Sequence, residues 1–285
     1  MSHSVRYARP HDLSGAFDMM DAYGPDASLL AGGTDLIVGL RSGRLAPRMI
    51  IDLKRISGLP PGITQRDGRL RVSAPTPLTD IIADRRIQDA FPALAEAAGT
   101  VGSVQIRNRA TLSGNICNAS PAADTAPALL AYGAEVVLIS RSRSRLVPVA
   151  DFLLGPRRTS RGADEIAAGV EIPIPPARTG SRFARLTRRR GVDLATISLC
   201  CTVGPRVTRF AYGAVGPRPF LVTDESGVLA DPEASPEARA EVLRDFVSQA
   251  APISDLRGGR QYRRAMLLVL SQRALRASIA RRDRT

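Results

Sequence analysis

The order of apolar and polar positions along the chain predicts a mixed structure of helices and strands. Helical spacing covers residues 10–23 and the segments FPALAEAAGTV and DTAPALLAY. Short apolar runs, among them RMIIDL, RLRVS and DEIAAGVEIP, are typical of strands. Helices and strands alternate in the first part of the chain, whereas the last part has strands followed by helices. We therefore expect an α+β fold.

Residues 172–181, IPIPPARTGS, form the best candidate for a domain boundary, because their prolines prevent regular structure. The runs RFARLT, TISLCCTVG, RVTRFAYGAV and RPFLVT follow as expected strands, and residues 236–249 and 259–280 as expected helices. The expected organisation is a domain over residues 1–176, with two α/β lobes that divide near residue 57, and a C-terminal domain over residues 177–285. The second domain should contain an antiparallel sheet of three or four strands plus helices.

Residues 29–40, LLAGGTDLIVGL, place two consecutive glycines between an expected strand and an expected helix. A strand-to-helix turn needs at most one glycine, so the pair indicates that something lies very close to the backbone. Bare amides at such a junction can bind an anion such as a phosphate. Two interpretations stay open at this point, a turn that needs glycine for its geometry and a phosphate site.

A second unusual stretch, residues 105–136, has small side chains, asparagines and almost no charge after Arg109. Asp124 directly precedes an expected helix, so it could be a helix cap or a ligand contact. Two loops of small residues suggest a dinucleotide held between them. The chain has no G-x-G-x-x-G fingerprint after a strand, and its single lysine does not belong to a phosphate-binding P-loop motif.

The net charge of +13 comes almost entirely from arginine, because Lys54 is the only lysine among 40 basic residues. The arginines are spread over several loops. Aromatic residues make up only 4% of the chain, whereas grooves that bind nucleic acid usually contain stacking aromatics. The distribution favours solvated arginine surfaces, with docking onto acidic protein partners as the alternative, and we expect no nucleic-acid partner.

Several other classes of protein and site are not expected. No run of about 18 uncharged apolar residues is present, so we expect no membrane span. The first residues lack the apolar core of a secretory signal. The three cysteines form neither a disulfide framework nor a CxxC pair, and this cysteine usage suits a reducing cytoplasm. The two histidines, His3 and His11, favour neither a catalytic triad nor a metal site. We therefore expect no metal ion.

The two loops together resemble those of the FAD-binding medium subunit of the molybdenum hydroxylases. This family includes aerobic carbon monoxide dehydrogenase and the flavin portion of xanthine dehydrogenase. Its first loop, close to A-G-G-T/H-D/S-L, is matched by residues 31–36, and its second, close to I-R-N-x-A/G-T-I/L-G-G-N, by residues 106–115. The motif N-x-x-P-x-x-D follows at Asn118, Pro121 and Asp124. The segments RRRGVDLATIS, AYGAVGPRP and YRRAMLLVLSQRAL extend the resemblance over essentially the whole chain.

The resemblance implies an FAD-binding domain of the vanillyl-alcohol-oxidase (PCMH) type, with FAD held between the two loops. The implied FAD contacts are Leu29, Leu30, Ala31, Gly32, Gly33, Thr34, Asp35, Leu36, Val101, Ala110, Thr111, Ser113, Gly114, Asn115, Asp124, Ile166, Arg185 and Leu194. Two positions depart from the family pattern. Ser113 replaces a glycine, which strains the backbone if φ is positive there, and Arg185 replaces a lysine.

By the same resemblance, the chain is an electron-transferring subunit without a catalytic acid or base of its own. A large subunit with a molybdenum cofactor passes electrons to the 2Fe-2S clusters of a small subunit. These clusters reduce FAD, and FAD passes the electrons to NAD, oxygen or a quinone. A dimer of heterotrimers is expected. The alternative is a stand-alone FAD-dependent oxidoreductase of the same fold, in which Asp193 assists proton transfer instead of being a solvated loop residue.

Overall fold

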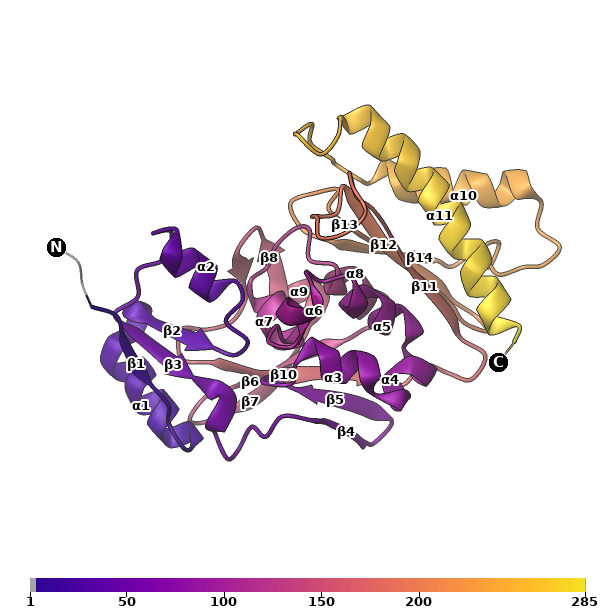
Figure 1. Cartoon of the computed structure of the whole chain (residues 1–285). Coiled ribbons are helices and arrows are strands. Elements are labelled where there is room, and N and C mark those ends of the chain that lie inside the picture. The colour runs from indigo at the N-terminus through magenta and orange to yellow at the C-terminus, as the bar shows by residue number, and fades with distance from the viewer. Residues whose placement is uncertain (1–3, 285) are drawn as a thin grey trace.

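Residues 4–284 are described by a computed structural model, and their strands form three main sheets and a small two-stranded hairpin (Figure 1). The main sheets have three, five and four strands. The three-stranded sheet lies at the N-terminal end of the molecule and the four-stranded sheet at the C-terminal end (Figure 1). This arrangement confirms the α+β class. No helix among the described residues has the length and apolar character needed to cross a membrane.

The first lobe is a parallel sheet in the order β1-β3-β2, packed against helix α1. Asp12 caps this helix, because its carboxylate accepts the N–H of Gly15 at 2.8 Å. The helix therefore begins three residues after the predicted start at residue 10. The elements of this lobe are β1 (Arg6–Ala8), α1 (Leu13–Tyr23), the 3-10 turn η1 (Gly24–Asp26), β2 (Ala27–Leu30), α2 (Leu36–Arg41), β3 (Met49–Asp52) and the 3-10 turn η2 (Leu53–Arg55).

The second lobe is an antiparallel sheet in the order β4-β5-β10-β6-β7, with its helices on one face. Its strands are β4 (Ile63–Arg66), β5 (Arg69–Ser73), β6 (Glu135–Ile139), β7 (Ser144–Pro148) and β10 (Ile166–Pro173). Its helices are α3 (Leu78–Ala83), α4 (Arg85–Ala90), α5 (Pro92–Gly99), α6 (Val104–Arg107), α7 (Leu112–Cys117), α8 (Thr125–Ala131) and α9 (Val149–Phe152), and a hairpin of β8 (Leu153–Gly155) and β9 (Arg158–Thr159) follows.

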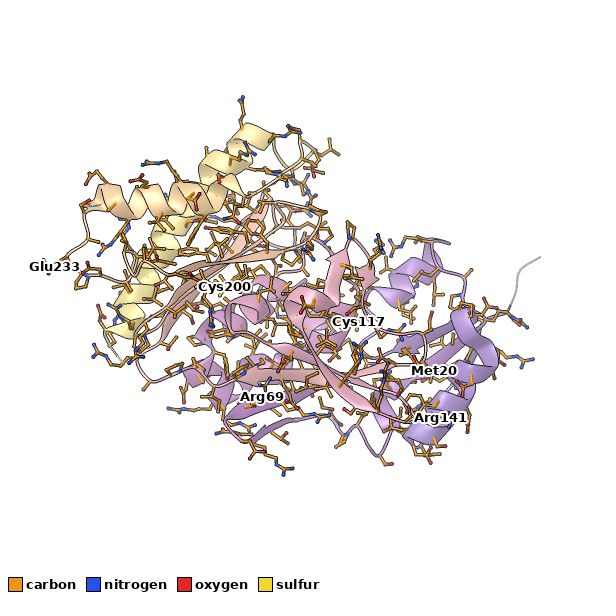
Figure 2. All side chains as sticks on the ribbon, turned by 180° about the vertical axis from the view of Figure 1, so that it is seen from behind. Met20, Arg69, Cys117, Arg141, Cys200 and Glu233 are labelled. Carbon is orange, nitrogen blue, oxygen red and sulfur yellow. The ribbon has the colours of Figure 1, made fainter. Side chains whose placement is uncertain are left out.

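The first lobe packs against the opposite face of the five-stranded sheet. Val137, Ile166 and Ala168 from that sheet share a buried apolar cluster with α1 and β3. Arg141, in the loop between β6 and β7, adds a polar link, since its guanidinium donates to Asp18 and Asp21 of α1 at distances from 2.5 to 3.1 Å. Figure 2 shows Arg141 beside this helix. The two lobes are thus held together over both apolar and charged contacts.

The C-terminal sheet is antiparallel in the order β11-β12-β13-β14, as the sequence pattern predicted. Helices α10 and α11 pack on one face, while α8 and α5 of the second lobe lie against the other (Figure 1). Every residue of α8 is buried, because it is enclosed between the two sheets. The elements are β11 (Gly180–Leu186), β12 (Ile197–Val203), β13 (Thr208–Gly213), β14 (Phe220–Asp224), α10 (Pro236–Ser248) and α11 (Arg260–Arg282).

Candidate functional site

A cavity of ≈ 780 Å³ opens where the two lobes and the C-terminal domain meet. Residues 27–29 and 31–36 at the end of β2 line one side, and most of residues 110–124 line the other. The β8–β9 hairpin and the loop between β11 and β12, residues 187–196, which we call the rim loop, complete the wall. Most of the residues implied by the family resemblance line this cavity; Leu30, Ile166 and Arg185 do not.

The two consecutive glycines are required for two different reasons. A Cβ atom on Gly32 would overlap the Arg109 carbonyl oxygen and lie 2.9 Å from the Cα of Ala110, so the first loop packs directly on the backbone of the second. Gly33 has φ = +80°, a conformation that glycine adopts without strain. The prediction of a close approach to the backbone is correct, and the approaching group in this structure is the second loop.

Both loops present backbone amides that no group within residues 4–284 accepts. On the first loop these are the N–H groups of residues 32–36, and on the second that of Ser113 in the first turn of α7. Thr111 starts this helix, because its Oγ1 accepts the N–H of Gly114 at 3.0 Å. Unsatisfied donors on two facing loops are suited to an anionic ligand that spans them.

Ser113, which replaces a family glycine, is accommodated without backbone strain. It lies within α7 and is not among the non-glycine residues with positive φ. Its side chain is 3% exposed, and its Oγ has no hydrogen-bond partner among the described residues. A buried hydroxyl in a cavity wall is costly unless a ligand or water satisfies it.

Asp124 is the second buried polar group with an unused atom. Its Oδ2 accepts a hydrogen bond from Arg185 at 2.7 Å, whereas its Oδ1 has no partner of good hydrogen-bond geometry within the described chain, although the Thr100 hydroxyl also favours the carboxylate. Although it stands at the N-terminus of α8, its side chain makes no capping hydrogen bond. Burial raises the pKa of this carboxyl to about 6, although Arg185 opposes that shift. The structure thus disfavours the cap alternative.

The three residues outside the cavity wall lie behind it. Successive side chains of a strand point to opposite faces, so Ile166 enters the core between the lobes while Ala167 lines the cavity. Leu30 lies beneath Gly33, where its Cδ1 would be 2.6 Å from an added Cβ. Arg185 stands behind Asp124, and its guanidinium compensates the carboxylate that lines the cavity.

The β8–β9 hairpin and its neighbours belong to the site, although no sequence motif indicated them. Arg157, Thr159 and Arg161 line the cavity, together with Arg44 beyond α2. Arg157 has φ = +58°, and its N–H donates to the Ala119 carbonyl at 2.9 Å, which docks the hairpin onto the second loop. The Gly-Pro pair before Arg157 was a turn signal in the sequence, but nothing local indicated where that turn would pack.

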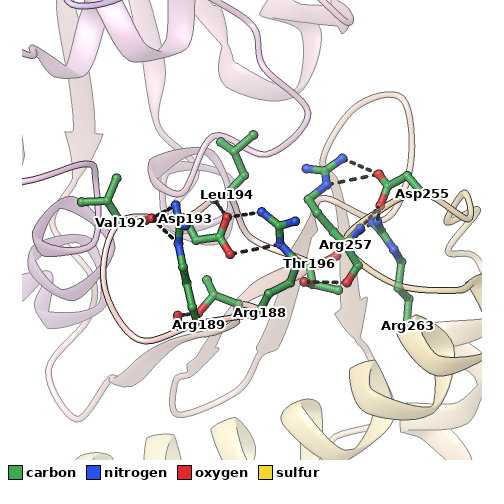
Figure 3. Close-up of polar contacts among 10 residues, drawn as sticks. Arg188, Arg189, Val192, Asp193, Leu194, Thr196, Asp255, Arg257 and Arg263 are labelled. Carbon is green, nitrogen blue, oxygen red and sulfur yellow. Dashed lines mark hydrogen bonds and ion pairs between the residues drawn. The ribbon is translucent and has the colours of Figure 1, made fainter.

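The rim loop is held by its own charges (Figure 3). Arg188 pairs with Asp193 at 2.9 and 3.2 Å, and Arg189 donates to the Val192 carbonyl. The Arg188 hydrogen bond lowers the pKa of Asp193 to about 2. Leu194, whose N–H donates to Asp193, is left 58% exposed at the cavity.

Arg263 of α11 fastens the base of this loop to the rest of the site (Figure 3). Its side chain is buried, forms an ion pair with Asp255, and donates to the carbonyls of Thr196 and Ala214 at 3.0 and 3.1 Å. The N–H of Ala214 in turn donates to the Pro121 carbonyl at 2.8 Å. A single guanidinium thereby connects the C-terminal helix, the rim loop and the second cavity loop.

Two protein-family models match the chain. The FAD binding domain in molybdopterin dehydrogenase matches residues 3–175, and the CO dehydrogenase flavoprotein C-terminal domain matches residues 182–278. The chain belongs to the family of FAD-binding subunits of molybdopterin dehydrogenases. This membership makes it the flavin subunit of an oxidoreductase, with FAD as its cofactor, and confirms the resemblance inferred from the two loops.

Similar members of this FAD-binding family align over nearly their whole length. The chain is 30% identical over 283 residues to the xanthine dehydrogenase FAD-binding subunit of Escherichia coli, with 96% of each chain covered. It is 30% identical over 281 residues to the carbon monoxide dehydrogenase medium chain of Hydrogenophaga pseudoflava, covering 96% of this chain and 97% of that one.

Solved structures show the same fold. A chain of carbon monoxide dehydrogenase from Hydrogenophaga pseudoflava matches with a TM-score of 0.89 at 30% identity, and 99% of each chain is covered. A chain of quinoline 2-oxidoreductase from Pseudomonas putida matches with a TM-score of 0.86 at 26% identity, and 97% of each chain is covered.

The cavity residues fit FAD. The two facing sets of free amides suit its diphosphate, and the unused Ser113 Oγ and Asp124 Oδ1 suit polar groups of its chain. Arginines at positions 44, 157 and 161 contribute positive charge to the same wall. Within residues 4–284, no three His, Cys, Asp or Glu side chains are grouped to hold a metal ion.

Proposed function

We propose that this chain transfers electrons through FAD between a partner subunit and an external acceptor. The observation that carries the proposal is the pairing of free amides with two buried, unsatisfied acceptors in the wall of one cavity. When bound, FAD supplies the capacity to accept and release electrons. The protein's contribution is to bind and orient the cofactor.

Different residues of the cavity bind different parts of the cofactor. The amides of residues 32–36 and of Ser113 hold the diphosphate, and Ser113 Oγ satisfies a polar atom next to it. Asp124 Oδ1 accepts a hydrogen bond from a cofactor hydroxyl, while Arg185 keeps the carboxylate paired. Val101 and Leu194 offer apolar surface for the flavin ring. Arg44, Arg157 and Arg161 compensate the remaining negative charge.

We further propose that an iron–sulfur small subunit delivers the electrons and that a molybdenum-cofactor large subunit supplies them, in a dimer of heterotrimers. The relatives' names support this, since they are FAD-binding subunits and medium chains of dehydrogenases. The acceptor is NAD, oxygen or a quinone. The three cysteines carry free thiols, which suits a reducing compartment such as the cytoplasm.

The surface at the rim supports a protein partner. Val192 and Leu194 are more than half exposed, and Leu256 is 95% exposed between Asp255 and Arg257, which lie beside the rim loop in Figure 3. Exposed apolar side chains among arginines suit a partner surface that is apolar with an acidic margin.

The stand-alone alternative has less support. It requires Asp193 to move a proton, but Asp193 is ion-paired with Arg188 and its pKa is lowered to about 2. A carboxylate with such a pKa is a weak base at neutral pH.

Co-expression with the genes that neighbour this one tests the subunit proposal. We expect the chain to co-purify with an iron–sulfur chain and a molybdenum chain, and the isolated chain to bind FAD at one per chain with negligible substrate oxidation. Turnover of a small organic molecule by the isolated chain at about 1 per second or more would instead support the stand-alone enzyme.

A further inference from the structure

Lys54 is the single lysine in a chain that has 40 basic residues. Every other one of these basic residues is an arginine. A single lysine in a chain whose other basic residues are arginines indicates a position where the shape of the ammonium group matters. Lys54 lies in η2, directly after β3, and its side chain is 27% exposed.

The ammonium group of Lys54 joins a buried carboxylate to the first cavity loop. Its Nζ lies 2.7 Å from Asp52 Oδ1 and 3.4 Å from the carbonyl oxygen of Ala31. Asp52 is 1% exposed and also accepts the Tyr7 hydroxyl at 2.5 Å, with Arg9 4.0 Å from the same oxygen. Burial opposes ionisation of Asp52, but the hydrogen bonds from Lys54 and Tyr7 outweigh it and lower its pKa.

The contact at Ala31 governs the direction of the next amide. The C=O and the following N–H of a trans peptide point in opposite directions, and the described residues contain no cis peptide bond. With its oxygen held by Lys54, the Ala31–Gly32 peptide directs its N–H away from Lys54. Ala31 and Gly32 line the cavity, whereas Lys54 does not.

We propose that Lys54 is a positioning residue for the cofactor diphosphate, because its ammonium holds the Ala31 carbonyl and thereby turns the amides that follow toward the cavity. This inference rests on the proposed FAD site. Lysine suits the position because one nitrogen meets both acceptors at a single point. Arginine would reach one bond further and spread its donors over a plane.

The test compares Lys54→Met and Lys54→Arg with Arg55→Met in the apoprotein, by titration with FAD. Arg55 is the exposed neighbour on the same turn, so its variant loses the same charge without touching Ala31. We expect Lys54→Met to bind FAD about 10-fold more weakly, and Lys54→Arg to lose a similar factor although it keeps the charge. Arg55→Met should bind FAD like the wild type.

Hydrogen exchange at saturating FAD separates positioning from general stability. In the wild type, FAD should protect the amides of both loops. In Lys54→Met the protection should be lost at residues 32–36 and kept at Ser113. Equal FAD affinity in Lys54→Met and the wild type, or full rescue by Lys54→Arg, would overturn the proposal. Failure of the wild type itself to bind FAD would instead overturn the proposed function.

Discussion

The two loops that face each other across the cavity are supported in opposite ways. The second loop belongs to the core: Leu112, Ser113 and Ile116 of α7 are buried, and Thr125 donates to Asn115 at 2.6 Å. The first loop leads into α2, in which only Gly39 is buried and Val38 is 59% exposed. Its peptide direction depends on Gly33 and on the single contact from Lys54.

Because of this difference, substitutions in the two loops should affect FAD affinity and the free energy of unfolding to different extents. A change in the second loop disturbs buried packing and should lower the free energy of unfolding as well as FAD affinity. A change in the first loop removes little buried surface, so it should act mainly on FAD affinity. The exception is Gly32, where the two loops touch.

The largest effect is expected for Gly32→Ala. The new Cβ would overlap the Arg109 carbonyl, so the two loops must separate. We expect FAD affinity to fall by on the order of 100-fold or more, about 3 kcal/mol. Gly43→Ala is the matched control, since Gly43 follows α2 with φ = +69° but has no atom near its would-be Cβ. That variant should lose about 1 kcal/mol of stability and bind FAD normally. Similar FAD affinities for the two variants would contradict the loop contact.

Asp124→Asn should weaken FAD binding by about 1.5–3 kcal/mol, the range for a hydrogen bond to a charged group. The amide keeps the size of the side chain but cannot pair with Arg185 as an anion. Calorimetric titration with FAD and thermal melting of the apoprotein measure the two consequences separately. Unchanged FAD affinity would show that Asp124 serves only Arg185.

Thr111→Val should cost about 1 kcal/mol of unfolding free energy, because the N–H of Gly114 loses its capping oxygen. FAD affinity should change only a few-fold. Thr34→Val is the counterpart on the first loop, where the threonine lines the cavity without a cap. It should leave the melting temperature unchanged. Equal stability losses in the two variants would remove the distinction between the loops.

The smallest effect on FAD affinity is expected from the titration of Asp124. Its folded-state pKa of about 6 lies above the ordinary value of 3.8, so the folded apoprotein binds this proton more tightly than the unfolded chain does. The resulting stability is present below about pH 4 and is lost as pH rises through about 6. FAD affinity should increase a few-fold over the same rise, as the carboxylate becomes a better acceptor. Asp124→Asn should show neither trend, and a wild-type profile that is flat from pH 4 to 7 would refute the assignment.

The local sequence pattern was sufficient to predict a helix or strand where that element buries one face or follows a strong turn signal. The helix at α11 and the four C-terminal strands were predicted close to their observed bounds, because their apolar spacing is regular. Helix α7 was missed, since LSGNIC has few apolar residues and a glycine. Packing around α7, together with the Thr111 cap, stabilises a segment whose own helical propensity is low.

The sequence by itself predicted the two loops that line the cavity, because small residues and glycines must occupy any backbone that a ligand or another loop approaches. It also determined the family, since the two loop motifs and several C-terminal segments match the family pattern along the chain. Only the tertiary structure decided which partner each residue meets. Gly32 faces the second loop, Ala167 replaces Ile166 in the cavity wall, and Arg185 stands behind Asp124. These contacts join residues far apart in the chain, and no local pattern encodes the distances between them.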